Sequence, residues 1–157
     1  SAASDVYKRQ DFLHNPGISV VRDAMVATDA GEVHAMHDPT EGGVATGIHE
    51  LTSAASVGAE IDESSLHYFE ETRAICEELD LDPLGLIASG ALLIAVAPDD
   101  AEKVVAALHA EEIAASVIGE LKEGADVVLR DGNGRRELPR YARDEIARLF
   151  ERSETPT

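Results

Sequence analysis

Residues 33–50 encode a strand, a polar turn and an amphipathic helix in direct succession, VHAMHDPTEGGVATGIHE. Pro39 lacks an amide donor and holds Asp38 in extended conformations, so the strand cannot continue through it. Thr40 follows with the hydroxyl of a good helix N-cap. Apolar residues then recur at helical spacing. They predict a buried helix face formed by Val44, Ile48, Leu51 and Ala55.

Two glycines, Gly42 and Gly43, stand where this helix is expected to begin. Glycine adopts positive φ freely and lets a ligand approach without meeting a Cβ. The first amides of a helix lack intrahelical partners, and the helix dipole attracts anions to that end. The turn is therefore a candidate phosphate or carboxylate site, and Gly43→Val is expected to block the ligand and leave the fold intact. The alternative is a tight strand-to-helix connection without a ligand.

The rest of the chain continues this alternation, which predicts an α/β fold with a single mixed β-sheet packed against helices. Further helices are expected at 19–28, 70–79, 100–110 and 141–150, and further strands at 58–62, 91–98, 114–121 and 126–130. The strand at 91–98 is apolar throughout, so we expect it to be central and covered on both faces.

The chain has 157 residues, enough for one domain with an ordinary core. We expect that domain to span residues 14–150. Residues 1–13 show no clear period and are interpreted as a tag or joining segment outside the family domain, and residues 151–157 as a flexible tail.

The charge is strongly unbalanced, with 31 acidic residues against 13 basic ones and a formal net charge of −18. Because the acids are spread along the whole chain, we interpret them as a surface adapted to high salt, with an acidic binding face as the alternative. We expect neither nucleic acid nor an anionic membrane as a partner, since the sequence has no basic stripe. No apolar stretch reaches the length of a membrane span.

Cysteine occurs once, as Cys76, inside a predicted helix. A single cysteine allows no disulfide within the chain, which favours a reducing, cytoplasmic location. Free cysteines are usually buried as small apolar residues. We therefore predict a structural role for Cys76 rather than a nucleophilic one.

Histidines flank the glycine-rich turn at His34, His37 and His49. In a strand, residues 34 and 37 point to opposite faces, so we expect no metal site here. His37 could contact an anion or act as an acid or base, with a solvated histidine as the alternative. A small basic cluster near the C-terminus could hold a phosphate or pair with nearby acids. It consists of Arg135, Arg136 and Arg140.

Four motifs in one order resemble the C-terminal domain of the AIR-synthase-related superfamily. They are MHDPTEGGVATGIHEL, VGAEID, LDPLGLIASGALLIAV and VIGEL, and the resemblance covers about residues 16–131. This superfamily includes AIR synthase, the hydrogenase maturation protein HypE, selenophosphate synthetase and thiamine-phosphate kinase. The resemblance is nearest to the HypE-like branch, whose pattern runs approximately M-R-D-P-T-R-G-G-L-A-T.

The resemblance implies an ATP-dependent phosphoryl-transfer enzyme. In such enzymes an N-terminal domain holds ATP and Mg²⁺ and makes the main homodimer contacts, and the C-terminal domain closes the site with its glycine-rich turn. Amide dipoles there stabilise charge on the transferring group. The resemblance assigns binding of a nucleotide or other small-molecule ligand to Asp38, Thr40, Gly42, Gly43, Ser89 and Gly90. It assigns no catalytic residue.

Three departures from the HypE pattern narrow these expectations. Glu41 stands where HypE relatives often carry Arg, and the chain ends in SETPT rather than in Pro-Arg-Ile-Cys. An ATP-binding N-terminal half is missing, so we expect no turnover from this chain alone. These departures argue against hydrogenase cyanide-ligand synthesis and leave the acceptor substrate unassigned. The alternative function is a non-catalytic, stand-alone binding or assembly module.

Overall fold

The computed structural model describes residue 14 and residues 17–153, with side chains described up to residue 150. Its helices are α2 (Val21–Ala30), α3 (Gly43–Ala55), α4 (Glu70–Leu79), α5 (Ala101–Ala110) and α6 (Ala147–Ser153). Its strands are β1 (Val33–His37), β2 (Gly58–Asp62), β3 (Leu93–Val96), β4 (Gly119–Lys122), β5 (Val127–Asp131) and β6 (Gly134–Glu137). Short 3-10 turns lie at η2 (Glu63–Ser65), η3 (Pro83–Gly85) and η4 (Pro98–Asp100). The segment expected to be a tag, 1–13, lies outside the described residues.

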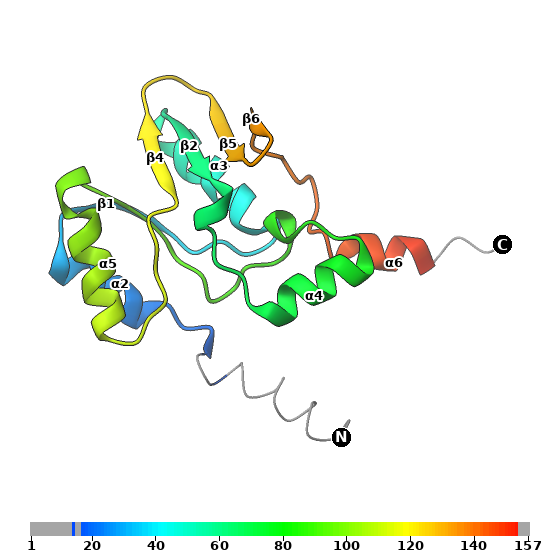
Figure 1. Cartoon of the computed structure of the whole chain (residues 1–157), viewed down its shortest axis with the longest axis horizontal. Coiled ribbons are helices and arrows are strands. Elements are labelled where there is room, and N and C mark those ends of the chain that lie inside the picture. The colour runs from blue at the N-terminus through cyan, green and yellow to red at the C-terminus, as the bar shows by residue number, and fades with distance from the viewer. Residues whose placement is uncertain (1–13, 15–16, 154–157) are drawn as a thin grey trace.

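The α/β class and the mixed sheet are confirmed. Four strands form one sheet in the order β4-β2-β5-β6, in which β2 and β5 run parallel and the other pairs run antiparallel. Strands β1 and β3 pair antiparallel in a separate two-stranded sheet, so the described strands form two sheets instead of the single one expected. Figure 1 shows this pair beside α2 and α5, with the larger sheet close to α3.

Strand β3 is not the central strand that its sequence predicted. Within the described residues it pairs with β1 alone, and all four of its residues are half-buried. Its apolar side chains are accommodated by packing against helices, not by strands on both sides. Ile94 and Val96 pack against the small core of α2 and α5, and Leu93 packs against the larger core around α3.

Helix α3 contacts strands of both sheets. The larger core is formed by apolar residues of α3, β2, β5 and η3, and by the residues that directly follow η2 and β6: Ala45, Ile48, Ala59, Ile61, Leu66, Leu84, Val127, Leu129 and Leu138. The buried face of α3 is rotated from the predicted one. Ile48 is buried as expected, but Ala45 and Thr52 are buried too, and Ala55 is exposed.

The C-terminal region differs most from expectation. Helix α6 begins at Ala147, not near residue 141, and it continues to Ser153 into the predicted tail. The residues before it, 139–146, form no helix or strand, and we call them the C-terminal strap. Strand β6 was not predicted, although the turn at residues 131–134 indicated a hairpin.

Cys76 is buried at 4% exposure, which confirms its predicted burial as a small apolar residue. Burial raises the pKa of its thiol, so the reactive thiolate is disfavoured.

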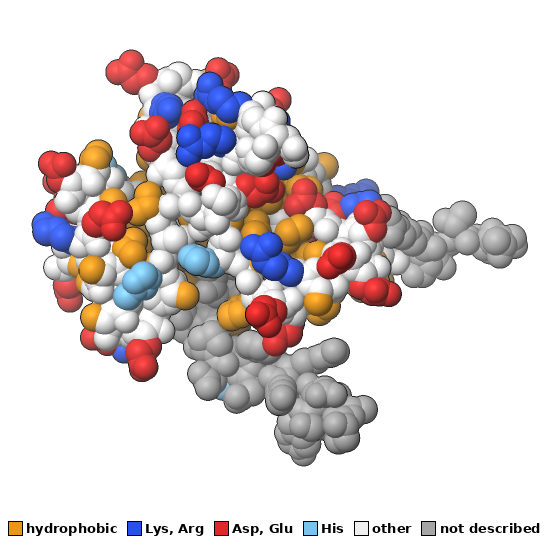
Figure 2. Space-filling view, viewed as in Figure 1, with side chains coloured by type: hydrophobic (Ala, Val, Ile, Leu, Met, Phe, Trp, Pro, Cys, Tyr) orange, Lys and Arg blue, Asp and Glu red, His pale blue; other side chains and the backbone are white. Residues whose placement is uncertain are grey.

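No described helix is long and apolar enough to cross a membrane. Figure 2 shows acidic and basic side chains interspersed on the face it displays. Adaptation of this surface to high salt stays a prediction.

Candidate functional site

The two segments assigned to the site lie side by side. The Ala88 amide donates a hydrogen bond to the Thr40 carbonyl oxygen at 3.2 Å, which joins the glycine-rich turn to the Ser89–Gly90 turn. Asp38, Thr40 and Ser89 are exposed, whereas Gly42 and Gly43 are buried. The structure therefore brings the sequence-assigned residues together, with the polar ones facing solvent.

Gly43 is required by close packing of the main chain. Its φ of +67° disfavours any side chain, and an added Cβ would lie 2.4 Å from the Leu84 carbonyl oxygen and 2.6 Å from that of Leu86. Carbonyl groups of a packed segment cannot move aside as a flexible side chain can. The expectation that Gly43→Val leaves the fold intact is therefore wrong.

Gly42 is the N-cap residue of α3, with a φ of +75°. Its amide donates to the Asp144 carboxylate at 2.9 Å, and the Gly43 amide donates to the Thr40 carbonyl at 3.1 Å. The Thr40 side chain is not the helix cap that the sequence predicted. Both glycine amides already have internal acceptors, so the expectation of bare amide groups at Gly42 and Gly43 is wrong.

The C-terminal strap holds this arrangement through a set of hydrogen bonds to η3 and to Asp82, the residue that precedes it. The Tyr141 hydroxyl donates to the Asp82 carboxylate at 2.5 Å, and the Asp82 amide donates to the Glu145 carboxylate at 3.0 Å. The Glu145 amide donates to the Gly85 carbonyl oxygen at 3.0 Å. The Tyr141 ring lies so close to Gly85 that an added Cβ there would be 2.4 Å from it. Burial, followed by the Asp82 carboxylate, raises the pKa of Tyr141.

The second turn is more open. Gly90 has a φ of +97° and is exposed, and an added Cβ there would lie 3.2 Å from the Ile18 Cα. Ile18 and Ile87 beside this turn are about half exposed. This turn can therefore present Ser89 to a ligand without rearrangement of the main chain.

The three histidines near the turn have separate environments. His37 pairs with Glu50 at 2.9 Å, and His34 lies 3.5 Å from Glu32. His49 is buried, with Nε2 at 3.1 Å from the Leu138 carbonyl oxygen. The described part of the chain contains no group of three or more His, Cys, Asp or Glu residues that could hold a metal ion.

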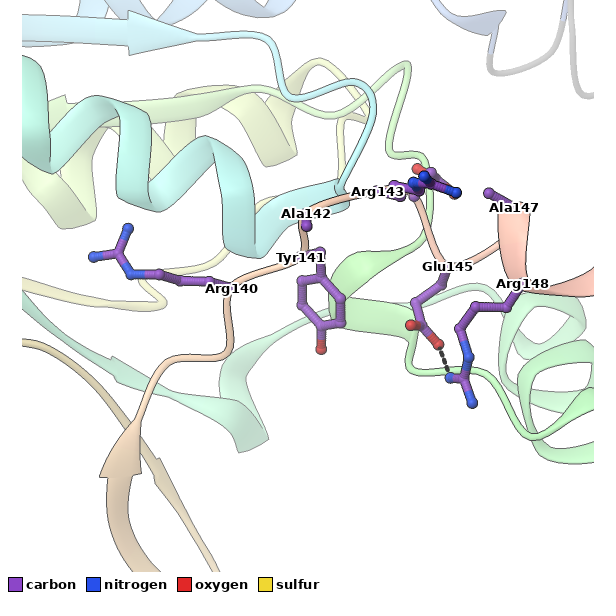
Figure 3. A pocket seen from close by; sticks show the side chains of 8 residues that line it. Arg140, Tyr141, Ala142, Arg143, Glu145, Ala147 and Arg148 are labelled. Carbon is purple, nitrogen blue, oxygen red and sulfur yellow. Dashed lines mark hydrogen bonds and ion pairs between the residues drawn. The ribbon is translucent and has the colours of Figure 1, made fainter. Parts of the chain in front are cut away.

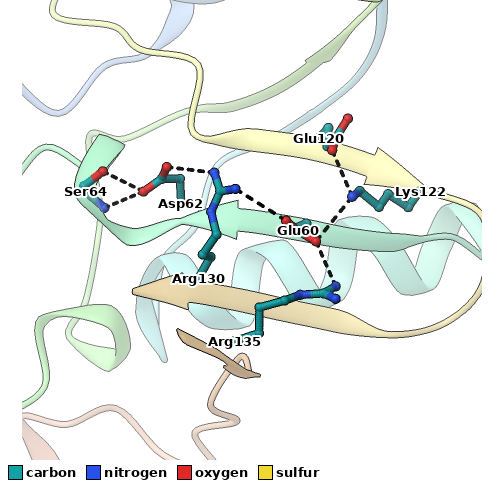
Figure 4. Close-up of polar contacts among 7 residues, drawn as sticks. All are labelled: Glu60, Asp62, Ser64, Glu120, Lys122, Arg130 and Arg135. Carbon is teal, nitrogen blue, oxygen red and sulfur yellow. Dashed lines mark hydrogen bonds and ion pairs between the residues drawn. The ribbon is translucent and has the colours of Figure 1, made fainter. Parts of the chain in front are cut away.

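The arginines near the C-terminus pair with acids, as one of the two sequence interpretations had it. Arg135 lies 2.8 Å from Glu60, which Lys122 and Arg130 also contact on the same face of the larger sheet (Figure 4). The hydrogen bond from Lys122, together with the nearby arginines, lowers the pKa of Glu60. Arg136 pairs with Asp131 at 3.0 Å. These pairs explain the basic residues of the sheet without a phosphate ligand.

Comparison with known proteins identifies the family. The family model described as AIR synthase related protein, C-terminal domain, matches residues 4–132. The chain belongs to this family. The match begins inside the segment 1–13 that we had placed outside the family domain, and it ends before the C-terminal strap.

Relatives of this AIR-synthase-related domain are HypE proteins. Carbamoyl dehydratase HypE of Escherichia coli (strain K12) is 40% identical over 103 residues, which is 64% of this chain and 31% of the relative. Carbamoyl dehydratase HypE of Rhizobium leguminosarum bv. viciae is 42% identical over 91 residues, 58% of this chain and 26% of the relative. The chain thus spans less than a third of these two relatives.

Solved structures agree with this family. The crystal structure of E. coli HypE superposes with a TM-score of 0.74 at 35% identity, covering 83% of this chain and 41% of that one. HypE in complex with ATP superposes with a TM-score of 0.66 at 29% identity, covering 74% of this chain and 38% of that one. In the crystal structure of a HypE–HypF complex the TM-score is 0.72 at 28% identity, over 78% and 41% of the two chains.

Sequence reasoning did not find the strap residues that support the AIR-synthase-related turn. A local signal exists for Asp144, whose carboxylate accepts the Ile146 amide at 3.0 Å as in a helix N-cap. No local signal links Asp144 to Gly42, because the two residues are 102 positions apart.

An open pocket of about 540 Å³ is lined by residues 140–145, 147 and 148. Arg140 and Arg148 point in different directions there, so they do not converge on one anion (Figure 3).

Proposed function

We propose that this chain supplies the C-terminal domain of an ATP-dependent, HypE-like enzyme and closes its nucleotide or substrate site. Asp38, Thr40 and Ser89 contact the ligand, and Gly42, Gly43 and Gly90 shape the turns that carry them. The observation that carries this proposal is the hydrogen bond from the Ala88 amide to the Thr40 carbonyl oxygen. It joins two segments that were assigned to one site from separate sequence motifs.

In this proposal ATP and Mg²⁺ are held mainly by an N-terminal ATP-binding domain. Mg²⁺ is usually bound through one or two carboxylates together with the phosphates of the nucleotide, so the ion would arrive with ATP. A HypE relative has been crystallised with ATP, which supports the nucleotide as ligand. The enzyme would be a cytoplasmic homodimer, and this chain would be inactive alone.

The contribution of this chain to the reaction would be to position the ligand. The hydroxyl groups of Thr40 and Ser89 can donate hydrogen bonds to phosphoryl or carboxylate oxygens and orient them. Phosphoryl transfer depends mainly on such positioning and on electrostatic stabilisation. Glu41 places a negative charge at the exposed side of the same turn, which disfavours a bare anion and favours a ligand that brings a cation.

A titration of the ¹⁵N-labelled chain with ADP in the presence of Mg²⁺, and with inorganic phosphate for comparison, tests this proposal. Amide resonances of residues 38, 40–44 and 88–90 are expected to shift together at millimolar ligand, because the two turns are hydrogen-bonded. Resonances of the Glu60 ion-pair network serve as the internal control for unspecific anion binding. Absence of shifts in both turns at millimolar ligand would contradict the assignment.

The second candidate is a non-catalytic binding or assembly module. It is favoured by exposed apolar side chains at Val21 and Met25, one turn apart on α2 and each 64% exposed. Such a face is suited to contact with another protein surface. Sedimentation and calorimetry of the chain separate the two functions. Tight self-association without any response to nucleotide favours the module.

A further inference from the structure

The geometry points to Asn133, in the hairpin between β5 and β6, as a site of spontaneous covalent modification that turns its side-chain amide into a carboxylate. The proposed function does not use this hairpin. Asn133 and Gly134 are exposed, and Asp131 pairs with Gly134 at the end of the ladder, so the loop contains only Gly132 and Asn133. The loop thus places a thermolabile asparagine directly before a glycine, in contact with solvent.

The main-chain nitrogen of Gly134 is the nucleophile of this reaction. It attacks the side-chain carbonyl carbon, Cγ, of Asn133, so a bond from that nitrogen to Cγ forms and the bond from Cγ to Nδ2 breaks. The side-chain nitrogen takes the Gly134 amide proton and leaves as ammonia, and a five-membered succinimide ring remains. One water molecule then opens the ring at either of its carbonyls and leaves an aspartate or an isoaspartate. Water is consumed, ammonia is released and the chain gains one negative charge.

Gly134 offers its nitrogen without steric hindrance. It has no Cβ, and a Cβ built there would meet no atom within 4 Å. The hydrogen bond from the Asn133 amide, at 2.7 Å, lowers the pKa of the Asp131 carboxyl most, and Arg136 adds to the effect. The Gly134 amide contributes to the same lowering, so its N–H is directed toward that carboxylate. A carboxylate at this N–H polarises it and makes the nitrogen a better nucleophile.

The structure also separates Asn133 from its neighbour Asp131, which precedes a glycine as well. The Asp131 carboxylate accepts the Asn133 amide at Oδ1 and the Arg136 Nε at Oδ2, the latter at 3.0 Å. Both contacts favour the ionised form, which lacks the leaving group that an amide or a neutral acid provides. Ring closure is therefore assigned to Asn133 and not to Asp131.

Modification changes the tip of the hairpin and leaves its base in place. In isoaspartate the main chain runs through the former side chain, so the two-residue loop becomes longer by one methylene group. The pair between Asp131 and Gly134 is then lost, whereas the pair between Leu129 and Arg136 lies further along the ladder. Leu138, at the far end of β6, is fully buried and keeps the strand on the larger core.

The test is incubation of the whole chain at mildly alkaline pH, folded in buffer and unfolded in urea, followed by tryptic peptide mapping. Trypsin cuts after Arg130 and Arg135, so one peptide, 131–135, reports on Asn133. Its mass should rise by the difference between an amide and a carboxylic acid, and isoelectric focusing of the intact chain should show one added negative charge. The other asparagine of the sequence, Asn15, precedes Pro16, whose nitrogen has no hydrogen to lose in ring closure.

Two variants control the experiment. Asn133→Gln keeps the amide and the net charge but requires a less favourable six-membered ring, so the mass change should be lost. Gly134→Ala places a Cβ beside the nitrogen and should slow the change, whereas Gly124→Ala, in a different turn, should leave its rate unaltered. An unmodified peptide 131–135 in the folded chain overturns the inference, whether or not the chain in urea reacts. Equal charge gain in Asn133→Gln, or isomerisation of Asp131 without a mass change, overturns the assignment to Asn133.

Discussion

The two turns of the candidate site contain glycines for different physical reasons. At Gly43, carbonyl oxygens of Leu84 and Leu86 approach so closely that even a methyl group would collide with them. At Gly90, the main chain takes a positive φ in an exposed position, and the nearest atom to an added Cβ is the Ile18 Cα at 3.2 Å. The first glycine is needed for packing, the second mainly for conformation.

This difference changes how glycine-rich turns should be interpreted. A glycine pair at the start of a helix suggested room for a ligand, but here the space is filled by main-chain atoms of η3 and by the C-terminal strap. The exposed polar residues around the pair remain available to a ligand. The glycines therefore determine where the turn lies, and the neighbouring side chains determine what it can bind.

The largest expected effect is at Gly43. Gly43→Ala should destabilise the fold by about 4 kcal/mol, because a positive φ costs a side chain about 1–2 kcal/mol and the collision with two carbonyls adds to it. Urea unfolding followed by circular dichroism measures the change. Gly132→Ala is the matched control, since its added Cβ meets no atom within 4 Å and its φ is not positive. A Gly43→Ala protein as stable as the control would refute the packing argument.

Gly90→Ala should cost less, about 2 kcal/mol, because only the positive φ and the nearby main chain of Ile18 oppose the side chain. Gly124→Ala provides the comparison: its φ of +101° is similar, but its added Cβ meets no atom within 4 Å. The difference between the two variants in urea unfolding isolates the effect of Ile18. If Gly90→Ala were as damaging as Gly43→Ala, the distinction between the turns would be lost.

Tyr141→Phe tests the C-terminal strap, which contacts the first turn and not the second. Removing the hydroxyl that donates to Asp82 should cost about 1.5 kcal/mol near neutral pH. The pKa of Tyr141 is raised in the folded state, so its contribution is complete below pH 10, the ordinary tyrosine value, and is lost as pH rises further.

Urea unfolding at several pH values checks this prediction. Wild-type stability should fall above about pH 10, and the fall should be smaller in Tyr141→Phe. Tyr68, whose pKa is raised to about 12 chiefly by burial, contributes a similar fall in both proteins. The informative quantity is consequently the difference between the two pH profiles. Identical profiles would show that Tyr141 is not held as the structure has it.

The sequence predicted features that depend on neighbouring residues and missed those that depend on distant ones. Strand β2 and helix α4 have the bounds that hydrophobic period and breaker residues indicated. The predicted central position of β3 was wrong, because a strand that packs against helices and a strand between two other strands can have the same run of apolar residues. The bond between Gly42 and Asp144 joins residues 102 positions apart, and no pattern in the chain encodes such a distance.

The smallest effect on stability is expected at Ser89, where the comparison between the turns becomes functional. Ser89 is exposed and lies outside the helices and strands, so Ser89→Ala should change the free energy of unfolding by less than about 0.5 kcal/mol. If the proposed site is correct, the same variant should weaken ADP binding about fivefold through loss of one hydrogen bond. Ser53→Ala, an exposed serine of α3, is the control for both measurements. Weakened binding without lost stability would place Ser89 at the ligand, whereas unchanged binding would remove it from the site and leave the first turn alone to contact the nucleotide.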